Sequence, residues 1–206
     1  MEAGSGLYFF VPESLYQNGE GSVSFQSGLS TSIGLGNFLK VPIGFSYNKI
    51  QGYMVEAQGL SPEKPWFMGD SFMPYIKLEA VIPLSVFEIS FFAGGAVNWN
   101  ASFTALKGNM EDDLVSGTTH TYISSLDFDN PLAFGWLAGG SFTVNIGDIG
   151  VSFLGEYRNL SADLALSGET CTGPLGAMNT PGTLNLADPK LVIRGWTLGI
   201  GGSFSF

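Results

Sequence analysis

Charge is scarce in this chain of 206 residues: charged residues make up 13% of it, against about 25% in a typical soluble domain. Eight Lys and Arg residues stand against 18 Asp and Glu residues, so the net charge is −10. Binding to nucleic acid depends on clustered Lys and Arg, and this balance excludes a nucleic-acid partner. We expect something other than charge to keep the surface compatible with its surroundings.

Cysteine and histidine occur once each. Cys171 has no second cysteine with which to form an intrachain disulfide. His120 has no second histidine, which removes every metal motif built on a His pair. We therefore expect no metal and no cofactor.

Long hydrophobic runs are also missing. No stretch of about 18 apolar residues occurs, so the sequence predicts no transmembrane helix. The opening residues MEAGSG lack the basic and apolar regions of a signal peptide. If the protein is exported, we expect this numbering to describe a mature form with an added Met1.

What is present is alternation with a period of two. In residues 22–36 large apolar side chains occupy one face, and Ser, Gly and Gln occupy the other, which is typical of a strand. Residues 6–11 are counted as a first strand. The same alternation returns at 41–47, 72–82, 87–103, 132–146, 149–157 and 196–206. The sequence therefore predicts an all-β fold of eight strands.

The predicted connections are of two kinds that alternate strictly. Short turns are expected near 37–40, at Pro83–Leu84 and at Gly147–Asp148, and long polar loops near 13–21, 58–70, 106–131 and 167–190. An even number of strands with short turns at one rim and long loops at the other is typical of outer-membrane barrels. We predict a single domain, residues 1–206, folded as an eight-stranded antiparallel transmembrane β-barrel with short periplasmic turns and long extracellular loops.

The apolar face of the strands is expected to meet lipid, because the opposite face is small and polar and the charges concentrate in loops. Trp136 and Trp196 lie ten residues from the predicted turn end of their strands, roughly 25 Å in height, where an aromatic girdle belongs. Phe87, Phe204 and Phe206 would form the lower girdle. In the alternative interpretation, these aromatic residues fill the core of a soluble protein.

Charged residues within the predicted walls fall mostly on the inner face: Lys77, Glu79, Glu88, Glu156 and Arg158. Charges inside a narrow barrel need partners, so we expect Lys77 and Arg158 to pair with these carboxylates. The cluster is either a structural plug of the lumen or a selectivity gate in a thin channel.

Two basic residues have outward parity. Arg194 would reach the headgroup level, where its side chain can extend to water. Lys49 would meet lipid unless a bulge at Asn48–Lys49 turns it inward. Without that bulge, the predicted orientation is weaker.

One acidic run stands out in the third long loop: Glu111, Asp112 and Asp113. Such carboxylates can bind a divalent ion, or bridge to lipopolysaccharide through cations. The run is equally consistent with a solvated acidic loop.

The chain ends in GWTLGIGGSFSF, with apolar residues alternating up to Phe206. With this ending and the alternation along nearly the whole chain, the sequence resembles the small eight-stranded outer-membrane proteins, the group that includes the OmpA transmembrane domain, OmpX and OmpW. Its members commonly end in a strand of alternating aromatics with a final Phe that the outer-membrane assembly machinery reads. Trp196, Phe204 and Phe206 match that ending, so the resemblance implies that the last strand closes onto the first and that Phe206 is an assembly signal.

The resemblance leaves two main functions open. The OmpW-like one is a narrow passage for small or hydrophobic solutes, and the Gly- and Ser-rich inner faces favour it slightly. The OmpX-like one is a closed structural barrel that presents surface loops for adhesion or interaction. Interdigitation of Met73, Tyr75, Phe92, Leu154 and Arg158 would fill the interior and favour the closed barrel.

A third class implied by the resemblance is a lipid-modifying outer-membrane enzyme. Its chemistry would need a nucleophile beside a base, and the neighbours of His120 do not match a known deacylase pattern, so we expect no enzyme. We expect an exported outer-membrane protein that contacts membrane lipid and lipopolysaccharide. We also expect a monomer, because a closed barrel leaves no free edge.

Overall fold

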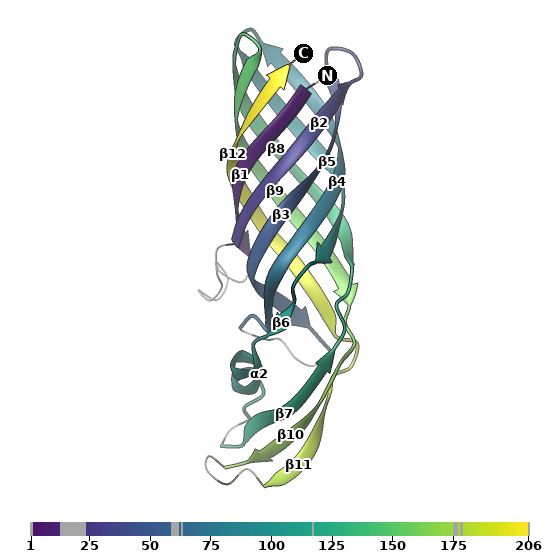
Figure 1. The fold of residues 1–206 in the computed structure, drawn as a ribbon, viewed down its shortest axis with the longest axis vertical. Helices are drawn as coiled ribbons and strands as arrows, with labels where there is room; N and C mark the ends of the chain where they lie inside the picture. The colour runs from purple at the N-terminus through teal and green to yellow at the C-terminus, as the bar shows by residue number, and fades with distance from the viewer. Residues whose placement is uncertain are drawn as a thin grey trace.

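Long antiparallel strands make up most of the fold. The computed structural model describes residues 2–12, 24–58, 62, 64–116, 118–174, 177 and 179–205. The longest strands are β1 (Glu2–Pro12), β2 (Ser24–Gly34), β3 (Leu39–Glu56), β4 (Phe67–Leu84), β5 (Phe87–Asn100), β8 (Ala133–Ile146), β9 (Ile149–Asp163) and β12 (Lys190–Ser205). Each pairs with the next in this order, and β12 pairs back with β1, which gives a ring of strands (Figure 1).

This strand ring does not have the same members at every level. β1 ends at Pro12, opposite Gly195, and β2 begins only at Ser24. Beyond that level β12 pairs directly with β3, with Lys190–Val192 opposite Met54–Glu56. The expected eight-stranded barrel is therefore confirmed only in part, as an all-β antiparallel fold with a ring of strands.

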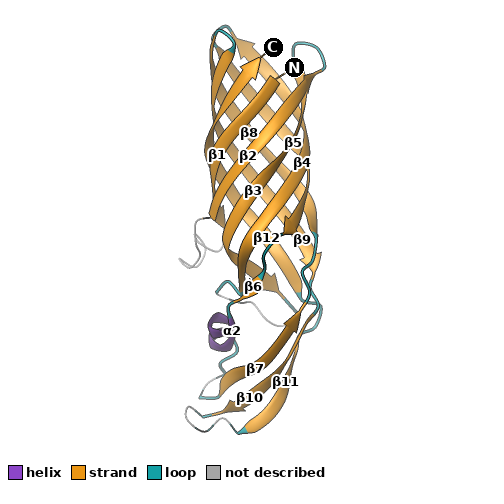
Figure 2. Cartoon of the chain, in the orientation of Figure 1, coloured by secondary structure: helices purple, strands orange, loops and turns teal. Residues whose placement is uncertain are grey.

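Further elements lie outside the strand ring. They are β6 (Thr104–Ala105), which extends the sheet by pairing with the start of β4, the short helix α2 (Lys107–Asp113), β7 (His120–Phe128), β10 (Leu166–Gly173) and β11 (Thr180–Asn185). β7, β10 and β11 form a separate sheet, here called the extension, which projects from the end of the ring opposite both termini (Figures 1 and 2). No helix in the described part of the chain has the length and apolar character needed to cross a membrane.

The predicted pattern of connections agrees with the structure in kind and differs in detail. Short turns at 35–38, 85–86 and 147–148 lie at one end of the ring, here called the turn end, near both termini. Gly147 has φ +63°, which glycine adopts without strain, and it lets Ile146 and Ile149 face each other as the closing pair. The turn predicted at Pro83–Leu84 is wrong: β4 continues through both residues, and the chain turns at Ser85–Val86.

The long connections at the opposite end, the loop end, were expected to be polar loops. Residues 101–132 instead contain β6, α2 and β7, and residues 164–189 contain β10 and β11. The predicted loop at 13–21 lies outside the described residues. The apolar residues of the extension are too widely spaced to show sustained alternation, and this spacing conceals its strands in the sequence.

The faces of the strands follow the predicted parity. Outward side chains are mostly large and apolar, and inward side chains include small, polar and charged residues together with a buried apolar set. Exposed side chains on the outside of the ring include Leu29, Ile43, Phe45, Ile76, Leu78, Ile82, Phe91, Phe134, Phe142, Phe153, Leu198 and Ile200. Buried polar side chains inside it include Gln26, Ser46, Asn48, Ser71, Lys77, Ser90, Asn98, Thr143, Glu156 and Arg158.

Candidate functional site in the ring interior

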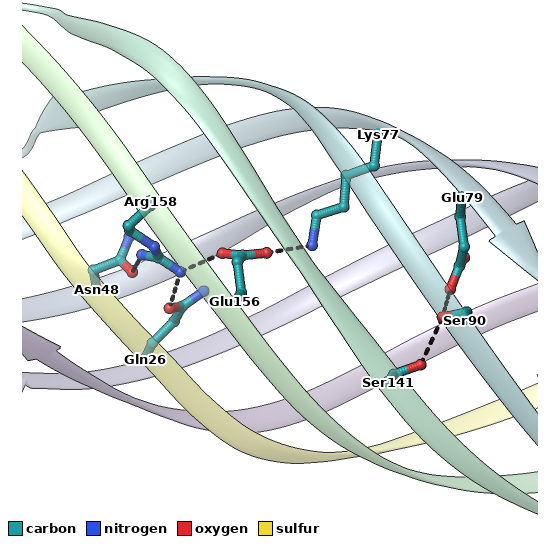
Figure 3. Close-up of polar contacts among 8 residues, drawn as sticks. All are labelled: Gln26, Asn48, Lys77, Glu79, Ser90, Ser141, Glu156 and Arg158. Carbon is teal, nitrogen blue, oxygen red and sulfur yellow. Dashed lines mark hydrogen bonds and ion pairs between the residues drawn. The ribbon is translucent and has the colours of Figure 1, made fainter.

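An ion-paired network crosses the middle of the ring interior. The carboxylate of Glu156 on β9 accepts from Lys77 Nζ on β4 at 2.6 Å and from Arg158 Nη2 at 2.9 Å. Arg158 also donates to Gln26 Oε1 on β2 at 2.7 Å and to Asn48 Oδ1 on β3 at 3.3 Å (Figure 3). All five side chains are buried. This interior network, Gln26, Asn48, Lys77, Glu156 and Arg158, joins opposite walls of the ring.

The other two carboxylates of the predicted cluster do not belong to the interior network. Glu79 accepts from Ser90, which is 2.9 Å from Ser141 (Figure 3). Glu88 forms an ion pair with Lys40 at 2.9 Å. Parity placed all five predicted charged residues inside. Lys77 and Arg158 both contact Glu156, whereas Glu79 and Glu88 have other partners.

Sequence reasoning missed Gln26, Asn48 and Lys40. Gln26 and Asn48 lie on inward-facing positions of their strands, but only charged residues were considered as network members. Lys40 was placed in a turn, whereas the structure places it in β3 opposite Glu79. The signal that could have identified Gln26 and Asn48 is an amide side chain on the same inner face as the guanidinium of Arg158.

Apolar side chains close the interior at the level of the network. Lys77 Nζ lies over two rings, 4.5 Å from the centroid of Tyr75 and 4.3 Å from that of Phe92. Met73 is buried beside them, and Tyr75 and Leu154 pack against the same cluster. Gly44 makes room for Tyr75, because a Cβ at Gly44 would lie 2.6 Å from the Tyr75 hydroxyl. Four of the five predicted bulky residues, Met73, Tyr75, Phe92 and Leu154, therefore lie together, whereas Arg158 contacts Gln26, Asn48 and Glu156.

Described residues line two small spaces inside the ring. A cavity of about 130 Å³ lies on the turn side of the network, lined by Lys77, Glu79 and serines from several strands. A second space of about 20 Å³ lies between Gln26, Met73 and Glu156. The first has room for water, whereas the second is barely one water in size.

The same apolar cluster continues to the loop end of the ring, and we call this part of it the loop-end cluster. Phe67 stacks on Phe103 at 4.4 Å between ring centroids and meets Phe128 at 5.1 Å. Leu137 and Leu160 from β8 and β9 are completely buried in the same cluster. The interior is thus obstructed at two levels, by the network and by this loop-end cluster.

Aromatic rows lie on the outside of the ring. Tyr157 lies between the two predicted girdle tryptophans, 5.7 Å from Trp136 and 5.3 Å from Trp196 between centroids. A second row joins Tyr47, Phe72 and Trp99 on β3, β4 and β5. Sequence reasoning did not assign this second row to the girdle.

At the turn end, Phe87 and Phe204 are exposed on the outside of the ring. Phe206, predicted for the lower girdle and as the assembly signal, lies outside the described residues. The girdle and assembly roles stay predictions.

Lys49 faces outward. The pairing of β3 with β4 is regular from Ile43 to Ile50, so the bulge needed at Asn48–Lys49 does not occur there. The register shifts only between Ile50 and Tyr53. Lys49 lies opposite Asp70, next to the Tyr47 row, so it belongs to the aromatic level of the outer surface. Arg194, also of outward parity, pairs with Glu56 at 3.2 Å.

The acidic run of α2 has protein partners. Asp113 accepts from the indole of buried Trp66 at 2.7 Å, and Glu111 accepts from the backbone N–H of Ile123 at 2.8 Å. Asp112 forms an exposed ion pair with Lys64 at 2.8 Å. These carboxylates fasten α2 to β7 and to the connection before β4. No group of three or more His, Cys, Asp or Glu residues in the described ranges is placed to hold a metal ion.

Replacing Asp113 tests this fastening. In Asp113→Ala the Trp66 indole loses a charged acceptor in a buried site, and we expect local opening to become easier by about 2 kcal/mol. Exchange of the Trp66 amide, which donates to the Tyr53 carbonyl at 3.0 Å, measures this opening. The matched change Asp112→Ala removes only an exposed pair and should cost about 0.5 kcal/mol. Equal effects of the two substitutions would contradict the assigned role.

Comparisons with known proteins add little to this geometry. No family model and no curated protein matches the chain. Among solved structures it is similar to the crystal structure of a major outer membrane protein from Thermus thermophilus, at 11% identity and a TM-score of 0.45, with 100% of each chain covered. A likeness at this level carries no argument about function.

Proposed function

We propose that this chain is an outer-membrane protein, an eight-stranded transmembrane barrel with a closed interior, and that it presents the extension at the cell surface for interaction with a partner. The observation that carries the proposal is a ring interior obstructed at two levels beneath an extension built from its own sheet. No enzymatic step is part of this proposal. Because β12 pairs back with β1, the ring has no free edge there, and we propose a monomer.

The outer surface of the ring supports the membrane part of the proposal. Large apolar side chains cover it between the turn end and the aromatic rows, while ion pairs and hydrogen bonds lie inside. In water such a surface would drive aggregation, whereas hydrocarbon accepts it. An outward apolar band flanked by aromatic residues around a polar interior is typical of transmembrane barrels.

A charge placed in this band tests membrane embedding. Leu78 is 56% exposed and lies near the middle of the outer face of β4. We expect Leu78→Arg to destabilise the protein folded in lipid vesicles, lowering its free energy of unfolding by about 2–4 kcal/mol, because an arginine would face hydrocarbon. Tyr122→Arg, at an exposed position of the extension, is the matched control and should change it by about 0.5 kcal/mol or less. A Leu78→Arg protein as stable as this control would contradict the embedding.

The passage for small or hydrophobic solutes is the less supported function. The cavity on the turn side ends at Lys77, which contacts Glu156 and two aromatic rings. A solute that passed this point would next meet Phe67 and Phe103 in the loop-end part of the same cluster. Transport through the interior would require both levels to move.

Conductance of the refolded protein in a planar bilayer separates the two functions. We expect no discrete current steps from the full chain, with heat-modifiable gel migration verifying that it is folded. Lys77→Ala should also be silent, because the loop-end cluster remains in place. Steps in the unmodified protein that change size in Lys77→Ala would overturn the closed barrel and favour the passage.

A further inference from the structure

We propose that the groove where the extension joins the ring is a docking site for a basic peptide segment of a partner protein, one that carries Lys or Arg beside aliphatic side chains. This inference rests on the proposed presentation of the extension and names the chemistry of its partner. The groove has a volume of about 510 Å³, within the range of roughly 300–1,000 Å³ typical of ligand sites. We call it the junction groove.

The junction groove forms where three chain crossings meet. β7 ends in Asp127 and Phe128. The β9–β10 connection and the start of β10 supply residues 164–167, and the β11–β12 connection supplies Leu186 and Pro189. Hydrogen bonds hold the crossings together: Leu164 donates to the Pro189 carbonyl at 2.9 Å. Ala165 donates to Asp129 Oδ1 at 2.8 Å. A groove held in this way is preformed, so a ligand would not have to order it.

The floor of the junction groove is apolar and its rim is acidic. Leu164 and Leu166 are buried, and Phe128, Leu186 and Pro189 are half-buried around them. Asp127 and Asp129 are exposed at the edge, and no Lys or Arg lines the groove. An occupant that satisfies both surfaces needs an apolar part and a positive charge.

The charge around the junction groove has the same sign. Residues 101–132 and 164–189 together contain seven carboxylates and one lysine, Lys107. Lys64, outside these segments, pairs with one of the seven, Asp112. The nearest cation along the chain, Lys190, lies in β12 opposite Asp163 and Glu56. The resulting field attracts cations and repels anionic lipid headgroups, so it would guide a basic partner to this end of the molecule.

An extended peptide fits better than a metal ion or a small molecule. The described residues provide no set of three metal-ligating side chains here. The groove is open to solvent along the junction, which suits a chain that contributes several side chains rather than a molecule that must be enclosed. Aliphatic side chains would cover the leucine floor, and neighbouring ammonium or guanidinium groups would reach the two aspartates.

Titration calorimetry on the full chain in phosphatidylcholine nanodiscs tests the inference, with empty discs as the blank. The probe is a capped hexapeptide of alternating leucine and lysine. We expect Asp127→Asn combined with Asp129→Asn to weaken its binding at least tenfold, since both amides keep the shape of the groove. Glu169→Gln combined with Asp148→Asn removes the same charge elsewhere and should change binding by no more than twofold.

Three results would overturn the junction groove. One is equal weakening by the two double variants, which would mean attraction by bulk charge. Another is that a control ligand binds as tightly as the leucine–lysine peptide. The control ligands are a peptide with glutamate in place of lysine, a peptide with serine in place of leucine, and spermidine. The third is no binding at millimolar concentration. Asp127→Asn alone keeps the hydrogen bond between Ala165 and Asp129. A loss of binding caused by misfolding of the double variant would therefore be absent from this single variant. If the peptide does not bind and the protein gives no current steps in planar bilayers, only the groove is rejected. Current steps in planar bilayers would reject the presentation role itself.

Discussion

Replacing Glu156 with Gln should lower the free energy of unfolding by about 3–5 kcal/mol, the cost of removing one partner from a buried ion pair. Glu156 is the shared acceptor of Lys77 Nζ and Arg158 Nη2, and all three side chains are almost completely buried. Without the carboxylate, two cations remain in the interior and repel each other. Reversible urea unfolding in lipid vesicles, followed by tryptophan fluorescence, measures the change.

Two variants make this result specific to Glu156. Glu88→Gln removes the same charge from the Lys40 pair, which is partly exposed at 2.9 Å, and should cost about 1 kcal/mol or less. Adding Lys77→Met to Glu156→Gln restores the original net charge of the trio, and we expect it to recover part of the lost stability. The network would have no structural role if Glu156→Gln cost no more than Glu88→Gln, or if Lys77→Met worsened the loss.

The inner and outer faces of the ring could be predicted from the sequence because a strand has only two faces. Once the apolar face of β9 is assigned to the outside, Glu156 and Arg158 must point inward together. Which strands' side chains then meet across the interior depends on the stagger of the strands and on the curvature of the ring. Neither can be read from alternation, so the sequence could not predict that Lys77 contacts Glu156 rather than Glu79.

The extension could not be predicted for a different reason. Its strands are short, and its apolar residues belong to a cluster shared with the ring and with α2, so no segment alternates for long enough to be recognised. Met110 and Ile123 are buried there, and the carboxylate of Glu111 bonds to the backbone of β7. A sequence reading that treats Gly, Pro and acidic residues as signs of a solvated loop misses carboxylates that serve as structural acceptors.

The loop-end cluster gives the second large expected effect. Phe67, the first residue of β4, is completely buried. It packs against Phe103, just before β6, and Phe128, the last residue of β7. We expect Phe67→Ala to lower stability by about 3–5 kcal/mol, because the truncation leaves a cavity in a packed core. The loss should be local, since Phe67 lies where the ring meets the extension and far along β4 from the turn end.

Amide hydrogen exchange resolves where protection is lost. Protection should fall in β7, β10 and the loop-end half of β4, and should persist between Ile76 and Leu84, where β4 pairs with β5. Tyr122→Ala truncates an exposed aromatic residue of the same extension and should cost about 0.5 kcal/mol. If both truncations cost the same, Phe67 is not central to the packing of the cluster. If protection falls evenly along β4, the extension and the ring unfold as one unit. Binding at the junction groove would then stabilise the whole molecule rather than the extension alone.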